Sequence, residues 1–236
     1  MEIKGFLDVS FVDWDGKISS VIFLPNCNFR CPFCHNLNLV FNPEKMDTIP
    51  FEYVENQLER QRGWTDGVCI TGGEPTLHND LPELCSRLKK MRFLVKVDSN
   101  GTNPSMLKKL MENGLIDYVA MDVKAPLTVE KYSKAIGVKA EKLLESVKES
   151  VEMLLGSSMD YEFRTTVVPR LHEKEDIEQI CRSLVGCRKY VLQKFDVSLG
   201  KETINPEFKK LKPFTDEEMQ KFLAAAQEII PNAKLR

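Results

Sequence analysis

Short apolar segments alternate with amphipathic helical patterns along this chain, and this alternation limits its fold more than any other feature. Six segments are apolar enough to be buried strands, namely 17–25, 67–71, 93–101, 116–124, 159–168 and 189–195. Apolar residues at helical spacing fill the segments 51–62, 81–91, 103–114, 140–155, 174–184 and 215–230. Because strands that alternate with helices form parallel sheets, we predict an α/β fold. Six units are too few for a closed eight-stranded barrel, which leaves a partial barrel or a doubly wound sheet.

The composition is that of a soluble globular protein, with 42% hydrophobic and 29% charged residues among 236. A net charge of −2 provides no broad basic field, so a nucleic-acid substrate is not expected. No apolar run reaches the length of about 18 residues that a membrane span needs. The N-terminus lacks the pattern of a signal peptide, and the seven cysteines are an odd number, so we predict a reducing, cytoplasmic location. No repeat or linker divides the chain, and a single domain over 1–236 is expected.

Polar residues follow the predicted strands at the ends where each strand finishes. They are Cys27, Cys31 and Cys34, then Gly72, Gly73 and Glu74, then Asp98 in a Asp-Ser-Asn-Gly stretch, then Asp122 and Lys124, with Arg164 inside the fifth strand. Each group taken alone could be only a turn. Both candidate folds place ligands at the carboxyl ends of their strands, so the shared location predicts a cofactor site.

Three of the seven cysteines lie within eight residues, in the stretch CNFRCPFC. Thiolates at this spacing select a soft metal, either zinc or an iron–sulfur cluster. Structural zinc requires four ligands, and the only neighbouring candidate, His35, is adjacent to Cys34 and poorly placed to reach the same ion. Three thiolates can instead hold three irons of a [4Fe–4S] cluster and leave the fourth iron open. The other cysteines, Cys69, Cys85, Cys181 and Cys187, are expected to be buried core thiols.

The Cys-x₃-Cys-x₂-Cys spacing, with Phe33 before its last cysteine, resembles the signature of radical S-adenosylmethionine (SAM) enzymes. The Gly72-Gly73-Glu74 stretch is similar to the second motif of that family. The resemblance extends over about residues 19–196 and implies a partial (β/α)6 barrel of TIM type, followed here by a C-terminal helix. It also implies that the open iron of a [4Fe–4S] cluster binds SAM. In such enzymes an electron from the cluster cleaves SAM to methionine and a 5′-deoxyadenosyl radical, which abstracts a hydrogen atom from the substrate.

The same resemblance implies roles for individual residues. Cys27, Cys31 and Cys34 are the expected cluster ligands, and Gly72, Gly73 and Glu74 are expected to accept hydrogen bonds from the SAM ammonium group. Lys124 suits the SAM carboxylate, while Asp98 suits the ribose hydroxyls or, with Asp122, a monovalent cation. The backbone of Phe33 is expected to contact the adenine and the side chain of Asn36 to contact SAM. Arg164 is the candidate catalytic residue, which would steer SAM or the backbone of the substrate.

Four stretches, CPFCHN, DSNGT, DVK and FRTTVVP, resemble those of glycyl-radical-enzyme activators, specifically the activating proteins of anaerobic ribonucleoside-triphosphate reductase and of pyruvate formate-lyase. This implies a glycyl radical enzyme as substrate protein and a low-potential electron donor such as flavodoxin or ferredoxin. Pyruvate formate-lyase activators carry a histidine at the end of the last barrel strand, where this chain has Lys194-Phe195-Asp196. No cysteine-rich insertion is present, so one cluster is expected. Two alternatives stay open: a radical SAM enzyme acting on a small molecule or tRNA base, and a non-catalytic metal-binding module.

Overall fold

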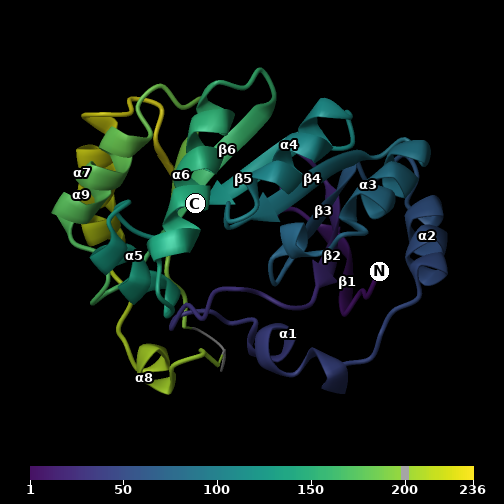
Figure 1. The fold of residues 1–236 in the computed structure, drawn as a ribbon, viewed down its shortest axis with the longest axis horizontal. Coiled ribbons are helices and arrows are strands. Elements are labelled where there is room, and N and C mark those ends of the chain that lie inside the picture. The colour runs from purple at the N-terminus through teal and green to yellow at the C-terminus, as the bar shows by residue number, and fades with distance from the viewer. Residues whose placement is uncertain (198–201) are drawn as a thin grey trace. The chain divides into compact units, whose positions relative to one another are not determined.

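The computed structural model describes residues 1–197 and 202–236, and its strands form one sheet in chain order from β1 to β8 (Figure 1). The strands are β1 (Gly5–Ser10), β2 (Ser19–Leu24), β3 (Gly67–Gly72), β4 (Leu94–Ser99), β5 (Tyr118–Asp122), β6 (Asp160–Val167), β7 (Tyr190–Lys194) and β8 (Lys234–Leu235). Strands β2, β3 and β4 pair in parallel, as do β6, β7 and β8, whereas β1 is antiparallel to β2. The six predicted strands are β2 to β7, and the predicted α/β fold is confirmed.

The α-helices are α1 (Leu37–Phe41), α2 (Phe51–Arg60), α3 (Leu81–Lys90), α4 (Pro104–Glu112), α5 (Val129–Ile136), α6 (Glu141–Leu155), α7 (Lys174–Ser183), α8 (Pro206–Lys209) and α9 (Asp216–Gln227). Six of them were predicted from helical spacing, and the cap of the C-terminal helix α9 is Thr215, the first residue of the predicted segment. There the Thr215 hydroxyl accepts from the Glu218 amide, and the Glu218 carboxylate accepts from the Thr215 amide. Helices α1, α5 and α8 and strands β1 and β8 were not predicted.

The chain divides into two compact units that interleave along the sequence. The first unit comprises Met1–Asn28, Asn38–Ser99 and Ser105–Ala120, and the second comprises Phe29–Leu37, Asn100–Pro104 and Met121–Arg236. The expectation of a single domain over 1–236 stays a prediction. Each unit has a buried apolar core of its own.

In the first unit, the parallel register of β2, β3 and β4 aligns Val21 with Cys69 and Cys69 with Lys96. Val21 and Cys69 are buried, as are Leu84 and Cys85 on the inner face of α3. Helix α2 packs on β1, and α3 packs on β4. The strands of a parallel sheet that is covered on both faces are expected to be apolar throughout. Lys96 is a buried charged residue in such a strand, so its ammonium group needs polar partners inside the protein.

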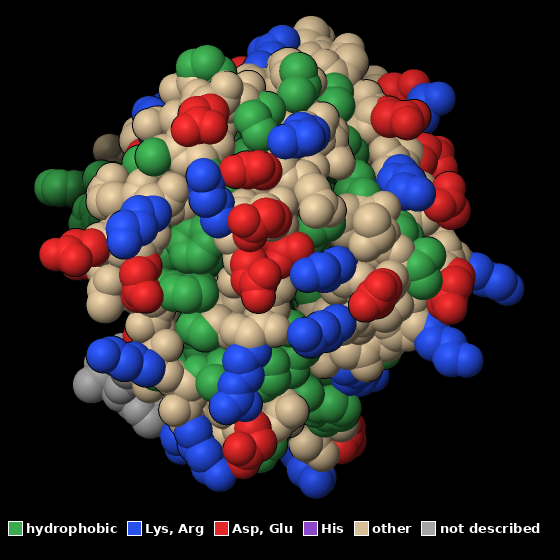
Figure 2. All heavy atoms as spheres, turned by 90° about the vertical axis from the view of Figure 1, so that its left-hand side faces the viewer, with side chains coloured by type: hydrophobic (Ala, Val, Ile, Leu, Met, Phe, Trp, Pro, Cys, Tyr) green, Lys and Arg blue, Asp and Glu red, His purple; other side chains and the backbone are tan. Residues whose placement is uncertain are grey.

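In the second unit, β6 and β7 align Phe163 with Tyr190, and both side chains are fully buried. The Tyr190 hydroxyl donates to the Thr165 hydroxyl at 2.9 Å, so this buried polar group is satisfied. Helices α7 and α9 pack against each other. Figure 2 views the side of the protein that carries these helices and shows acidic and basic side chains interspersed there, as the near-neutral net charge leads us to expect.

The four cysteines outside the CNFRCPFC stretch are buried, as predicted. Burial raises the pKa of Cys85 to about 12 and that of Cys187 to about 11, so these thiols stay protonated at neutral pH. In the part of the chain that the structure describes, none of the helices has both the length and the apolar character to cross a membrane.

A buried carboxylate in β6 provides a test of the second unit. Glu162 is 1% exposed, and its carboxylate accepts hydrogen bonds from Arg236 at 3.1 Å while Lys189 lies 3.0 Å away. Burial by itself raises the pKa of Glu162, but these cations outweigh burial and hold the pKa below its usual range. The charged carboxylate therefore stabilises the fold above the unfolded pKa of about 4.3, and this contribution is lost as the pH falls through the lower folded pKa.

We expect Glu162→Gln to lower the free energy of unfolding at pH 7 by about 1.5–3 kcal/mol, because a buried charge-assisted pair is lost. The difference from wild type should shrink as the pH falls from about 5 to 3. Urea unfolding at several pH values measures both effects. The control is Glu145→Gln, an exposed partner of Lys148 whose loss should cost less than about 1 kcal/mol. A Glu162→Gln difference that is independent of pH would contradict the assigned role of the charge.

Candidate cofactor site

The Gly72-Gly73-Glu74 turn of the first unit is fastened to the backbone that precedes Cys27. The Gly73 amide donates to the Leu24 carbonyl at 2.8 Å, and the Glu74 amide donates to the Asn26 carbonyl at 2.7 Å. Gly72 has a φ of 112°, a conformation that favours glycine. A Cβ on Gly73 would lie 1.8 Å from the Asn26 oxygen. Glycine is therefore required here by a close backbone approach, which holds this turn beside the start of the cysteine stretch.

The Glu74 side chain is turned into the protein, where it is 1% exposed. Its Oε1 atom accepts hydrogen bonds from the Thr76 amide at 3.1 Å, from the Thr76 hydroxyl at 2.5 Å and from the Ser99 hydroxyl at 2.9 Å. Because Ser99 ends β4 and Glu74 follows β3, this carboxylate ties two strand ends together. The sequence indicated Glu74 as a ligand residue; Ser99, which positions it, was not singled out.

Asp98 lies at the end of β4 and is held by a buried lysine on the same strand. The Lys96 ammonium group donates to the Asp98 Oδ1 atom at 2.6 Å and to the Asp13 carbonyl at 2.6 Å. Lys96 is 1% exposed, so its charge depends on these partners. Residues two apart lie on the same face of a strand, so the spacing of Lys96 and Asp98 in the sequence could have predicted this contact. The result is a carboxylate with a fixed orientation at a strand end.

In the second unit, Asp122 lies between two cations. The Arg164 Nε atom is 2.8 Å from Oδ1 of Asp122, and the Lys124 Nζ atom is 2.8 Å from Oδ2. Burial raises the pKa of Asp122, but the charges of Arg164 and Lys124 outweigh it and hold this pKa well below its usual range. Burial likewise lowers the pKa of Lys124, and the negative charge of Asp122 outweighs it. All three groups are therefore charged at neutral pH, and the cluster has a net charge of about +1.

This positive cluster lies close to Cys31 and Cys34. The Lys124 ammonium group is 5.9 Å from the centre of the Phe33 ring, and a thiolate at Cys31 contributes to the raised pKa of Lys124. Burial raises the pKa of Cys34, while the Asn36 amide, 3.4 Å from its sulfur, and the charge of Lys124 act in the opposite direction. The predicted residues Phe33, Asn36, Lys124, Asp122 and Arg164 are thus brought together around two of the three predicted metal ligands.

Backbone hydrogen bonds hold the cysteine stretch within the second unit. The Arg30 amide donates to the Ile136 carbonyl at the end of α5, and the carbonyls of Pro32 and Cys34 accept from the segment after residue 203. Gly137, with a φ of 69°, permits the first contact, because a Cβ there would lie 2.1 Å from the Arg30 oxygen. These contacts fix the loop from both sides without using its thiols.

The segment Lys194-Phe195-Asp196, at the end of β7, also supports the cysteine stretch. The Phe195 ring stacks on His35 with an angle of 7° between the planes and meets Phe33 edge-on. The His35 Nδ1 atom is 3.0 Å from the Glu202 carbonyl oxygen, so this ring is engaged away from the thiols. Lys194 forms an exposed ion pair with Asp216.

Two further residues near Lys124 had no usable sequence signal. The Val168 amide donates to Nδ1 of His172, so Nε2 carries the proton and donates to the Lys124 carbonyl at 2.9 Å. Burial lowers the pKa of His172 and keeps the ring neutral. The Tyr132 hydroxyl is buried and has no hydrogen-bond partner among the described residues. Burial raises the pKa of Tyr132, and the charges of Lys124 and Cys31 also act on it.

The three candidate ligands, Cys27, Cys31 and Cys34, fit an iron–sulfur cluster better than a single metal ion. No three His, Cys, Asp or Glu side chains within residues 1–197 and 202–236 are gathered tightly enough to hold one metal ion. A cubane cluster distributes its thiolate ligands over separate irons, so its cysteines need not converge on one point. Cys31 and Cys34 face a net positive charge, which suits an anionic thiolate cluster.

Comparisons with known proteins agree with this chemistry. The Radical SAM superfamily matches residues 21–184 of the chain. A protein of Methanocaldococcus jannaschii named "Putative glycyl-radical enzyme activating enzyme" is 34% identical over 99% of this chain and 95% of its own length. A protein of Thermococcus kodakarensis named "Probable GTP 3',8-cyclase" is 31% identical over 54% of this chain and 41% of its own length.

Among solved structures, Streptococcus suis SuiB bound to S-adenosylmethionine superimposes with a TM-score of 0.65 at 16% identity. The match covers 92% of this chain and 51% of SuiB, so the chain spans about half of that protein. At this identity the likeness concerns the fold alone. It confirms the partial barrel, rather than the doubly wound sheet, as the arrangement of the six strand–helix units.

The close approach at Gly73 can be tested by adding one methyl group. We expect Gly73→Ala to lower the free energy of unfolding by about 1–3 kcal/mol, because the Cβ would push the turn away from Asn26. Gly156→Ala is the matched control, since its Cβ would meet only ordinary contacts at 3.6 Å and the cost should stay within about 0.5 kcal/mol. Chemical denaturation of both variants measures the difference. Equal stabilities would show that the turn is not fastened as described.

Proposed function

Because this chain belongs to the radical SAM superfamily, we propose that it is a glycyl-radical-enzyme activating enzyme that binds a [4Fe–4S] cluster through Cys27, Cys31 and Cys34. Membership of the family implies the cluster and SAM. When bound, these two groups supply an electron and a cleavable sulfonium, and hence the 5′-deoxyadenosyl radical. The protein supplies binding, orientation and charge.

The observation that carries the proposal is the net positive Arg164–Asp122–Lys124 cluster beside Cys31 and Cys34. Three thiolates and the SAM carboxylate bring negative charge into this region, and a buried cation compensates it far more strongly than an exposed one. The raised pKa of Lys124 keeps that cation charged across the physiological range. A non-catalytic metal-binding module would have no use for such a cation next to its thiols.

Each remaining residue has a role that its contacts support. Lys124 binds the SAM carboxylate, and Arg164 keeps Asp122, and through it Lys124, in position. The carbonyls of the Gly72-Gly73 turn accept from the SAM ammonium group, while the Glu74 carboxylate holds that turn to Ser99. Asp98, oriented by Lys96, accepts from the ribose hydroxyls.

Phe33 and Asn36 contact the adenosyl part of SAM, in line with the resemblance. We retain a monovalent cation as part of the proposal. This cation would bind the Asp122 carboxylate. One oxygen of that carboxylate already contacts Lys124 and the other contacts Arg164. Such a cation would therefore need additional oxygen ligands.

The assignment to activators, rather than to small-molecule radical SAM enzymes, rests on the extent of similarity. The activator-named relative matches 99% of this chain, whereas the cyclase-named relative matches 54%. We therefore propose that the substrate is a glycine of a partner protein and that a low-potential flavodoxin or ferredoxin supplies the electron. The odd number of seven cysteines suits the reducing cytoplasm as the location.

The proposal predicts that the anaerobically reconstituted protein, reduced with dithionite, cleaves SAM to 5′-deoxyadenosine. Incubation with SAM and a glycyl radical enzyme from the same source should give a glycine-centred doublet in the electron paramagnetic resonance spectrum. Cys31→Ala should lose cluster and cleavage together, while Cys85→Ala, which removes a buried core thiol, should keep the cluster. Cleavage without a glycyl signal on any such partner would favour the small-molecule alternative. A zinc-only protein would overturn the assignment altogether.

We further expect Lys124→Met to weaken SAM binding roughly 10- to 100-fold, which corresponds to a charged hydrogen bond of about 1.5–3 kcal/mol. Iron and sulfide content should stay at the wild-type level, because Lys124 is not a cluster ligand. Titration of SAM into the reconstituted protein measures the affinity. Lys142→Met, an exposed substitution on α6, serves as the control. Unchanged affinity in Lys124→Met would assign the SAM carboxylate to another residue.

A further inference from the structure

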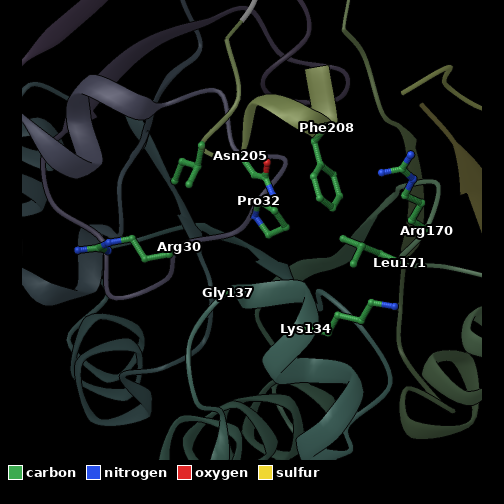
Figure 3. Close-up of a pocket in the computed structure, with 9 residues that line it drawn as sticks. Arg30, Pro32, Lys134, Gly137, Arg170, Leu171, Asn205 and Phe208 are labelled. Atoms are coloured by element: carbon green, nitrogen blue, oxygen red, sulfur yellow. The ribbon is translucent and has the colours of Figure 1, made fainter. Parts of the chain in front are cut away.

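A cavity of about 590 Å³ in the second unit has one wall made by the cysteine stretch itself (Figure 3). Arg30 and Pro32, the residues on either side of Cys31, line it. The other walls come from the end of α5, from the loop after β6, and from the segment leading into α8. The cavity therefore lies against the backbone of a proposed cluster ligand.

The lining combines an apolar base with a cationic rim. Pro32, Leu171 and Phe208 form the apolar part, and in Figure 3 Lys134 and Arg170 lie on one side of them with Arg30 on the opposite side. None of the described lining residues is an aspartate or a glutamate. An apolar centre with a charged rim is the composition of a protein-binding surface.

The two cations on one side are available to a partner. Lys134 and Arg170 are exposed, and neither forms a close ion pair within the described residues, although the charge of Arg170 contributes to the lowered pKa of Glu207. Arg170 also has a φ of 70°, which is uncommon for a residue other than glycine. Non-glycine residues in this conformation cluster at functional sites, because the surrounding structure must maintain them. The rim thus complements a negatively charged partner.

The position of the cavity indicates which partner this is. A protein substrate must bring its glycine to the carboxyl ends of the strands, yet none of Glu74, Asp98, Asp122 and Lys124 lines this cavity. What lines it is the backbone around Cys31. Electron transfer weakens steeply with distance, so a donor must dock over the loop that holds the cluster.

We propose that this cavity, with its Arg30, Lys134 and Arg170 rim, is the docking site for an acidic electron-donor protein. The inference rests on the proposed function and adds the place where the electron enters. With flavodoxin as donor, the anionic flavin hydroquinone loses one electron and becomes the neutral semiquinone. The cluster accepts that electron and passes from the +2 to the +1 state, with no proton exchanged.

The test is the rate of cluster reduction, measured anaerobically by stopped-flow absorbance with reduced flavodoxin and, in parallel, with reduced ferredoxin. The double variant Lys134→Glu/Arg170→Glu should lower the second-order rate constant at least about tenfold at low ionic strength and weaken its salt dependence. A charge-matched control, Lys108→Glu/Arg182→Glu, reverses one exposed lysine and one exposed arginine outside the cavity and should reduce at the wild-type rate.

Dithionite, which needs no docking site, should reduce the double variant as fast as wild type and support the same cleavage of SAM. Wild-type reduction rates in the double variant with both donor proteins would overturn the docking site. It would also be overturned if the donor rates held while dithionite-driven glycyl radical formation fell, since the cavity would then receive the substrate protein. Absence of SAM cleavage in dithionite-reduced wild type would instead overturn the proposed function, and the reduction rates would still report on docking.

Discussion

The charges of Asp122, Lys124 and Arg164 form the interaction on which the chemistry of the second unit depends. A carboxylate buried alone would take up a proton, and a lysine buried alone would lose one. Each keeps the other charged, and the second cation leaves the cluster net positive. That residual charge lies next to Cys31 and Cys34, where a thiolate-bound metal group brings negative charge. His172 extends the arrangement by holding the Lys124 backbone from the loop after β6.

Close backbone approaches hold the loops that carry the site. Gly73 brings the turn after β3 against Asn26, and Gly137 brings the end of α5 against Arg30. Each contact restrains the backbone next to or within the cysteine stretch and involves none of its thiols. Phe195 adds an aromatic support, between Phe33 and His35, in the place where pyruvate formate-lyase activators carry a histidine. The cysteines therefore remain available for a cofactor while the backbone around them is fixed.

Sequence reasoning was strongest where one residue type at one spacing leaves few chemical options. The spacing of Cys27, Cys31 and Cys34 predicted a cluster rather than zinc, and the alternation of apolar segments predicted the six strands β2 to β7. It was weakest for residues that act through others. Lys96, Ser99 and His172 lie beside predicted site residues, but a single lysine, serine or histidine in a sequence does not reveal what it contacts.

The sequence by itself determined the α/β class, the order of the six units and the identity of the residues at the strand ends, because these depend on local periodicity and on side-chain chemistry. Only the tertiary structure decided that Asp122 pairs with both Lys124 and Arg164. It also decided that the Glu74 carboxylate accepts hydrogen bonds from Thr76 and Ser99. It alone also decided that a cation-rimmed cavity adjoins the cysteine stretch. Such features join residues distant in the chain, and their energies depend on burial, which appears only when the chain is folded.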